Sequence, residues 1–228
     1  LLLLLFAQIF RGVAFGNIFE GLNFDANGWH GSLLGLLNPY GLVTGVLFVL
    51  LFLEHGALWL SVKTSGGVAE RSKAIAGSVW YALLAVAVIF LAYTNFATHL
   101  YDNYRNQPLW LIAPLLAVAA LLAVKLFARA GKYFSAFLSS CLTIISVVAT
   151  GVIGLFPNMI PSSVDSAFNL TVYNSSSTTY TLQIMTVVAL IFVPIVIAYQ
   201  LWIYRIFRED MGGAVIYGQG ESDVGPAG

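Results

Sequence analysis

The chain alternates between long apolar runs and short polar connections. Five of the runs are long enough to cross a membrane, because an α-helix rises about 1.5 Å per residue and the hydrocarbon layer is about 30 Å thick. An N-terminal run, residues 1–19, is interrupted by Arg11, so it predicts only a short or irregular helix. The pattern therefore predicts an all-α fold, a polytopic integral membrane helix bundle with five clear transmembrane helices. These helices are expected at residues 40–62, 74–97, 109–127, 133–156 and 182–207.

Prolines and polar residues predict where several of these helices begin and end. Asn38 can cap a helix N-terminus, and Pro39 suits the first turn, where its missing N–H is not needed. Pro157 and Pro161 stop the helix before them, because proline also disfavours helical geometry in the residue that precedes it. The Ser-, Thr- and Asn-rich segment that follows predicts an ordered loop. The Gly- and Asn-containing segment at residues 20–35 predicts another loop, at the membrane interface.

The composition supports a membrane protein. Hydrophobic residues make up 59% of the chain and charged residues only 9%, against about 25% charged residues in soluble domains. Most of the surface is therefore not expected to meet water. The formal net charge is zero, which argues against a nucleic-acid partner, since such binding needs clustered Lys and Arg. The single cysteine, Cys141, can form neither an internal disulfide nor a thiolate metal site.

Basic residues gather in alternate connections, which predicts the orientation of the chain. Cytoplasmic connections of membrane proteins carry an excess of Lys and Arg. The basic connections and the C-terminus are therefore expected in the cytoplasm, and the loop after Pro157 outside. Arg11 does not fit this pattern, because the connection after its helix must then be external. The basic residues of the three cytoplasmic segments are Lys63, Arg71 and Lys73; Lys125, Arg129 and Lys132; and Arg205 and Arg208.

The pattern predicts one transmembrane helical domain, residues 1–210, and a short tail, residues 211–228. The tail is polar and Gly-rich, so it is expected to be disordered, and its position after the last helix makes it cytoplasmic.

Glu54 and His55 are an adjacent ionisable pair inside an apolar run. An ionisable side chain within a membrane helix is costly and is a functional hypothesis by default. One interpretation is an intramembrane polar contact or proton path toward a partner subunit. The other is that both side chains reach toward the cytoplasmic end or hydrogen-bond to a neighbouring helix. Because they are adjacent, they point about 100° apart and cannot share one helix face.

Several ordered motifs resemble subunit II of cytochrome bd-type quinol oxidases. The resemblance covers residues 12–207, and that subunit is longer, with eight spans. It implies that this chain is a truncated or internally deleted form. A cleaved signal peptide is another explanation for the start at Leu1. The motifs are GVAFGN at 12–17, LNPYGL at 37–42, HGA at 55–57, FPNMIPSS at 156–163, NLTVYNSSS at 169–177, LQIMTVVA at 182–189 and FVPIV at 192–196.

The resemblance implies a complex in a bacterial inner membrane that oxidises quinol and reduces dioxygen to water. It places two b-type hemes and one d-type heme in the partner, subunit I. This chain is then a scaffold without catalytic, cofactor-binding or metal-binding residues, although a structural quinone or lipid is allowed. The residues agree with this, since His30 and His99 fall in external connections and only His55 lies in a span.

Two other classes remain as alternatives, a stand-alone secondary transporter and a purely structural membrane protein. Transporters tend to contain internal repeats and helices broken near the midplane. The two halves of this chain show no such repeat, and Pro157 and Pro161 lie at a helix end. Co-purification with a heme protein would separate the oxidase subunit from both alternatives.

Overall fold

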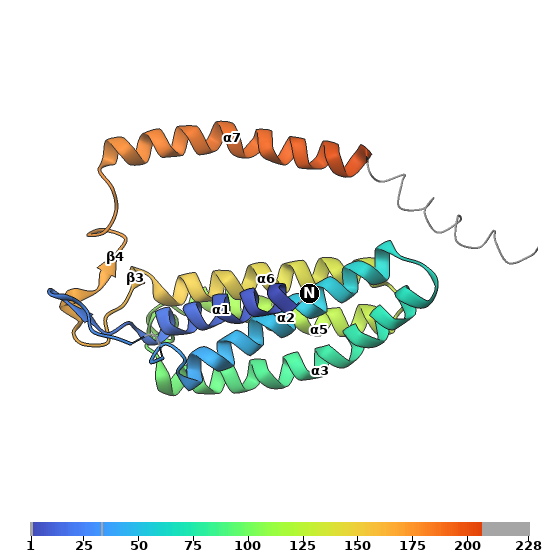
Figure 1. Ribbon diagram of the computed structural model, residues 1–228, viewed down its shortest axis with the longest axis horizontal. Helices are drawn as coiled ribbons and strands as arrows, with labels where there is room; N and C mark the ends of the chain where they lie inside the picture. The colour runs from blue at the N-terminus through green and yellow to red at the C-terminus, as the bar shows by residue number, and fades with distance from the viewer. Residues whose placement is uncertain (1, 33, 207–228) are drawn as a thin grey trace, which may run out of the picture. The chain divides into compact units, whose positions relative to one another are not determined.

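The computed structural model describes residues 2–32 and 34–206, and α-helices dominate it (Figure 1). The all-α prediction is confirmed. Among the described residues, five helices are long and apolar enough to cross a membrane. The helices up to residue 175 are α1 (Leu2–Glu20), α2 (Pro39–Lys63), α3 (Gly66–Ala97), the short α4 (Asp102–Asn106), α5 (Ile112–Arg129) and α6 (Tyr133–Leu155).

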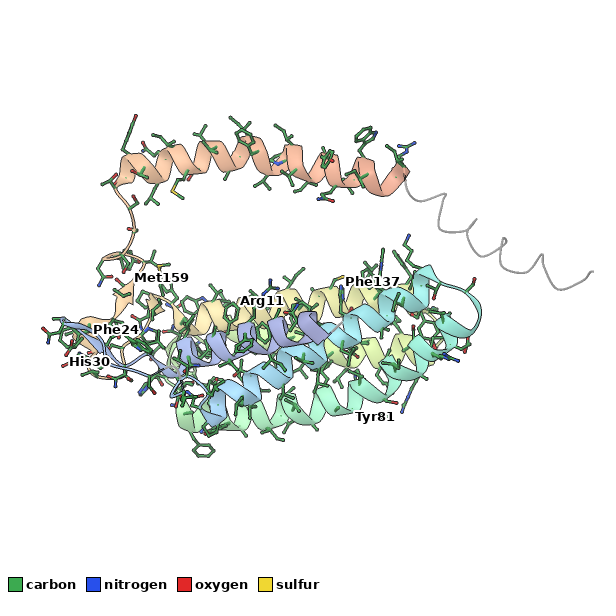
Figure 2. The ribbon with its side chains drawn as sticks, viewed as in Figure 1. Arg11, Phe24, His30, Tyr81, Phe137 and Met159 are labelled. Atoms are coloured by element: carbon green, nitrogen blue, oxygen red, sulfur yellow. The ribbon has the colours of Figure 1, made fainter. Side chains whose placement is uncertain are left out.

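The N-terminal helix is more regular than expected. α1 is one continuous α-helix of 19 residues, so the interruption expected at Arg11 does not occur. Arginine is itself a good helix former, and a charge in an apolar run changes the solvation of the helix rather than its backbone. Arg11 is exposed midway along α1 (Figure 2).

Helical structure extends beyond two of the predicted apolar runs. α3 begins at Gly66, so Arg71 and Lys73 lie on the helix and not in a connection. α5 likewise continues to Arg129, two residues past the predicted end, so Lys125 and Arg129 both lie on the helix and not in a connection. Charged residues such as Lys, Arg and Glu have good helix propensity, so a helix can continue after its apolar run has ended. This difference brings basic side chains into contact with neighbouring helices.

The predicted signals at helix ends are confirmed where the structure tests them. The Asn38 side chain accepts a hydrogen bond from the Gly41 N–H, and Pro39 is the first residue of α2. α6 ends at Leu155, directly before Phe156 and Pro157. The connection between α3 and α5 includes α4 and a 3-10 turn, η1 (Pro108–Leu111), which leads into α5.

Glycines bring α1 and α2 close together. A Cβ atom added to Gly12 would lie 2.5 Å from the Gly45 Cα, and one added to Gly16 would lie 2.7 Å from the Gly41 Cα. Both distances are too short for any side chain, so the two backbones are in direct contact. Each helix carries two glycines four residues apart, a pattern that favours close helix packing in membranes.

The core of the bundle lies around α2, which packs against α1, α3 and α6. Tyr40 and Leu58 of α2 and Leu83 of α3 are almost completely buried. The Tyr40 hydroxyl and the Thr94 Oγ1 are 2.9 Å apart, so this buried phenol has a hydrogen-bond partner on α3. Because the Tyr40 hydroxyl is hydrogen-bonded, its burial in the apolar core costs little free energy.

The ends of the bundle differ in structure. At one end, which we call the basic end, α2 and α5 finish and α3 and α6 begin (Figure 1). At the other end, which we call the loop end, lie two small antiparallel β-ribbons. The first pairs β1 (Phe24–Asp25) with β2 (Gly28–Trp29), the second pairs β3 (Asn158–Ile160) with β4 (Leu170–Thr171), and a 3-10 turn, η2 (Ser166–Phe168), lies between β3 and β4.

Residues far apart in the sequence join these two ribbons. The Leu22 N–H donates to the Pro161 carbonyl at 2.9 Å, and the Ser163 N–H donates to the Leu22 carbonyl at 2.9 Å. The Ser162 hydroxyl donates to the Phe24 carbonyl at 2.6 Å. Both predicted loops are therefore ordered, and they form one structure at the loop end.

A second unit begins at Ser176 and contains α7 (Thr179–Ile206). α7 has 28 residues and includes Pro194, and its length and apolar character confirm the last predicted span. The polar tail, residues 211–228, lies outside the described residues. The division into a domain at 1–210 and a tail stays a prediction.

Candidate functional site

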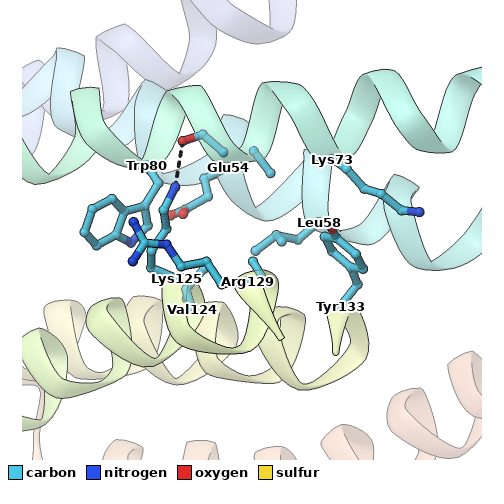
Figure 3. Close-up of a pocket in the computed structure, with 11 residues that line it drawn as sticks. Glu54, Leu58, Lys73, Trp80, Val124, Lys125, Arg129 and Tyr133 are labelled. Carbon is cyan, nitrogen blue, oxygen red and sulfur yellow. Dashed lines mark hydrogen bonds between the residues drawn. The ribbon is translucent and has the colours of Figure 1, made fainter. Parts of the chain in front are cut away.

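A cavity of about 190 Å³ lies between α2, α3, α5 and α6 toward the basic end. We call it the basic cavity. Its wall combines one carboxyl group with three cationic side chains and two aromatic rings, an unusual set for the inside of an apolar bundle. The charged and aromatic residues that line it are Glu54, Lys73, Trp80, Lys125, Arg129 and Tyr133 (Figure 3).

Glu54 is the most deeply buried charged residue of the cavity. Its side chain is 1% exposed, and its Oε1 atom has no hydrogen-bond partner among the described residues. A buried carboxyl group without partners loses the hydration that it has in water, and this costs several kcal/mol in general. Helix packing therefore does not explain why an ionisable side chain occupies position 54.

Lys125 faces the cavity from α5. Its Nζ atom donates to the Gly77 carbonyl at 3.2 Å (Figure 3) and lies 4.1 Å from the centre of the Tyr81 ring. The Trp80 ring is the second aromatic neighbour, 5.3 Å from the same atom. The contacts that hold the Lys125 ammonium group are therefore two aromatic rings and a carbonyl, and not a carboxylate.

The other cations are held nearer the basic end. Lys73 pairs with Glu70 at 2.7 Å and lies 5.0 Å from the centre of the Tyr133 ring. The Arg129 Nη2 atom is 3.4 Å from the Tyr81 hydroxyl. Arg129 is exposed, so the cavity has a basic rim.

His55 points away from the basic cavity, although it follows Glu54 directly. Its Nδ1 atom is 2.8 Å from the Ser140 hydroxyl, and its ring stacks on Phe137 with 4.8 Å between ring centres. Both partners belong to α6. The structure thus confirms that Glu54 and His55 do not share a face of α2, and it brings only Glu54 together with the basic residues.

The sequence pattern did not indicate Lys125, Arg129 or Trp80 as neighbours of Glu54. The two cations fall in one of the predicted basic connections. Lys125 and Arg129 are four residues apart at the end of a helix, so they share a face. That spacing was readable, but the identity of the facing helix was not.

The remaining histidines lie at the loop end. The His30 Nε2 atom is 2.9 Å from the Asp25 carboxylate, and this hydrogen bond holds the pKa of Asp25 below its ordinary value. His99 is paired in the same way with Asp102 at 3.1 Å. In the part of the chain that the structure describes, no group of three or more His, Cys, Asp or Glu side chains could hold a metal ion.

A second and larger hollow of about 840 Å³ lies at the loop end, beside α1. We call it the apolar pocket. Its lining is apolar except for Asn17, whose amide donates to the Val13 carbonyl at 2.8 Å and to the Leu36 carbonyl at 2.7 Å. The pocket is lined by Phe10, Val13, Ala14, Asn17, Ile18, Leu22, Phe24, Trp29, Leu34, Leu36, Leu37, Ile160 and Leu170.

Comparisons with known proteins give consistent results. The family described as "Cytochrome bd terminal oxidase subunit II" matches residues 5–207. "Cytochrome bd-I ubiquinol oxidase subunit 2" of Escherichia coli K12 is 31% identical over 237 residues, 88% of this chain and 62% of the relative. "Probable cytochrome oxidase subunit 2" of Haemophilus influenzae is 30% identical, covering 85% of this chain and 59% of the relative.

"Cytochrome bd ubiquinol oxidase subunit 2" of Bacillus subtilis is also 30% identical, covering 87% of this chain and 58% of the relative. The chain thus spans about three fifths of the length of the curated relatives that it matches.

Proposed function

Because the chain belongs to the cytochrome bd terminal oxidase subunit II family, we propose that it is a membrane subunit of a quinol oxidase. The complex would oxidise quinol and reduce dioxygen to water, as the names of the relatives and the resemblance imply. The observation that carries the proposal is the family match over residues 5–207, together with helices that are long and apolar enough to cross a membrane.

We place the two b-type hemes and the d-type heme of the complex in a partner, subunit I. The histidines of this chain do not fit a heme site, which needs His, Met, Cys or Tyr as axial ligands. His30 and His99 are paired with aspartates at the loop end, and His55 is engaged by Ser140 and stacked on Phe137. The role of this chain is then to support the heme-bearing subunit.

Arg11 supports the presence of a protein partner. It is exposed midway along the apolar helix α1. A guanidinium group at this depth is costly against lipid and is normally covered by protein or water. A heme-bearing subunit that packs beside α1 would provide such cover.

Three further assignments belong to this proposal. Glu54 and His55 remain the candidates for an intramembrane polar contact or proton path. The apolar pocket suits the tail of a structural quinone or a lipid, because its lining is almost entirely hydrophobic. The basic end faces the cytoplasm of a bacterial inner membrane, and so does the C-terminus, by the positive-inside rule.

The test is to purify the chain from membranes in a mild detergent and record reduced-minus-oxidised optical spectra. Bands of b- and d-type heme that co-purify in a constant ratio with a larger protein would support the oxidase subunit. A chain that purifies alone and colourless, also after an N-terminal extension to the length of its relatives, would contradict it. Oxygen consumption with added quinol then measures the activity of the complex.

A further inference from the structure

The Oε1 atom of Glu54 points to a ligand within the basic cavity. This atom is buried and has no hydrogen-bond donor among the residues that the structure describes, although the side chain lines an open space. Buried polar atoms in folded proteins are nearly always satisfied, by protein or by ordered water. The ligand must therefore be a small hydrogen-bond donor, and the space must be large enough to hold it.

We propose that the basic cavity is filled with water from the basic end, and that Glu54 exchanges protons with that water. A volume of about 190 Å³ has room for on the order of six waters at ~30 Å³ each. Glu54, Lys73, Lys125 and Arg129 line part of the space and can supply the polar partners that a stable internal water needs.

The cavity has the right depth for this role. Glu54 lies nine residues before Lys63, the last residue of α2, which is ~14 Å along a helix. Arg129 and Lys73 lie nearer the basic end, where Arg129 is exposed. A short column of water that extends from Glu54 to Arg129 and Lys73 would connect the carboxyl group with the solvent without crossing the bundle.

The charges around Glu54 explain why water, and not a direct ion pair, occupies the space. From α3 the facing group is Lys73, from α5 Lys125 and Arg129, and from α6 Tyr133. Lys125 donates to the Gly77 carbonyl and forms no ion pair with Glu54. Water between the two side chains would link the ammonium group to the carboxyl group.

The step itself is a simple proton transfer. A proton from water converts the Glu54 carboxylate into a carboxylic acid and later returns to water, and no electron moves. Delivery of that proton toward dioxygen reduction rests on the proposed function. His55 takes no part in this exchange, because its Nδ1 atom is engaged by Ser140 on a different face of α2.

The first experiment tests for water and needs no oxidase activity. Glu54→Cys and His55→Cys are made separately in a Cys141→Ser background, so that each protein has one thiol. Membrane vesicles are treated with a charged, membrane-impermeant methanethiosulfonate from either side. Glu54→Cys should react about tenfold or more faster than His55→Cys, and only from the side of the basic end, because the reagent needs a hydrated thiolate. Equal or absent labelling would overturn the proposal.

The second experiment tests proton exchange in the purified, full chain with its co-purifying partners. Infrared spectra recorded across a pH series should show a carboxylic acid band that is lost in Glu54→Gln and kept in the control Asp102→Asn. Asp102 is an exposed carboxylate at the loop end. Glu54→Asp should restore a band, which distinguishes the lost acid from a misfolded variant. If Glu54→Gln leaves every band unchanged, the proposal is wrong.

The role in turnover is measured last. If the complex is an oxidase, Glu54→Gln should lower quinol-driven oxygen consumption on the order of tenfold or more, and Glu54→Asp should recover most of it. Unchanged turnover in Glu54→Gln would contradict proton delivery through Glu54. If no heme protein co-purifies, the proposed function fails, while labelling and infrared results still decide whether Glu54 is hydrated and exchanges protons.

Discussion

The two ends of the bundle are built in different ways. At the loop end, backbone atoms meet directly, as between Gly16 and Gly41 or between Leu22 and Pro161. At the basic end, long side chains fill the space between the helices, and Lys125 packs over the Tyr81 ring. Where two backbones are in direct contact, the helices cannot shift or accept a larger side chain. Flexible side chains, in contrast, can move and can enclose water. The loop end is therefore suited to holding the helices in place, and the basic end to chemistry.

The largest expected effect comes from adding a methyl group where α1 meets α2 near the loop end. In Gly16→Ala the new Cβ would lie 2.7 Å from the Gly41 Cα, so the helices must separate. Overpacking of this kind costs about 1–3 kcal/mol, and the thermal midpoint in detergent should fall. Gly56→Ala on α2 is the control, because its Cβ would meet nothing within 4 Å. Equal midpoints for both variants would show that the backbone contact is not needed.

A slightly smaller effect is expected from Asn17, which joins α1 to the start of α2. Its amide donates to the Val13 and Leu36 carbonyls, and its oxygen accepts from Asn38 at 3.2 Å. Asn17→Leu leaves these groups unsatisfied and should cost about 1–3 kcal/mol in the free energy of unfolding.

The comparison for Asn17→Leu is Asn106→Leu, an exposed position at the end of α4. Denaturant unfolding of both variants measures the difference. A loss of stability no larger than that of Asn106→Leu would argue that the loop end does not depend on this network.

At the basic end, Trp80→Phe should have a moderate effect. The indole N–H of Trp80 donates to the Leu121 carbonyl at 2.9 Å, and its ring lies beside Lys125. Loss of the hydrogen bond should cost about 1 kcal/mol, measured as a shift in the thermal midpoint. Trp59→Phe is a matched change on α2, and Trp59 contacts Phe137 through its ring. If Trp59→Phe costs as much as Trp80→Phe, the indole hydrogen bond does not stabilise the basic end.

The smallest effect is expected at the β1–β2 hairpin. The hydrogen bond from His30 holds the pKa of Asp25 below its ordinary value. Asp25 therefore stabilises the hairpin at pH values above that ordinary value, and this contribution is lost as the pH falls through the lowered pKa. The protection factors of the hairpin amides, which are exchange rates corrected for the intrinsic pH dependence of exchange, should fall on acidification, and His30→Ala should weaken that dependence. An identical pH dependence in His30→Ala would show that the pair is not formed.

The sequence alone determined which helices are long and apolar enough to cross a membrane, because the length of an apolar run and the chemistry of its ends are local properties. The last span and the start of α2 at Asn38 and Pro39 were predictable in this way. The family was also readable from ordered motifs between residues 12 and 207. The continuity of α1 could not be predicted in this way, because a charged residue such as Arg11 changes the solvation of a helix and does not break its backbone.

Only the tertiary structure decided which side chains meet. Glu54 and His55 are adjacent and looked equivalent, yet one lines the basic cavity and the other is held by Ser140. Lys125 reaches the same cavity only because α5 lies against α3, and Leu22 meets Ser162 only because two distant loops share the loop end. In a membrane helix nearly every face is apolar, so the pattern of residues does not reveal which neighbour each face will meet.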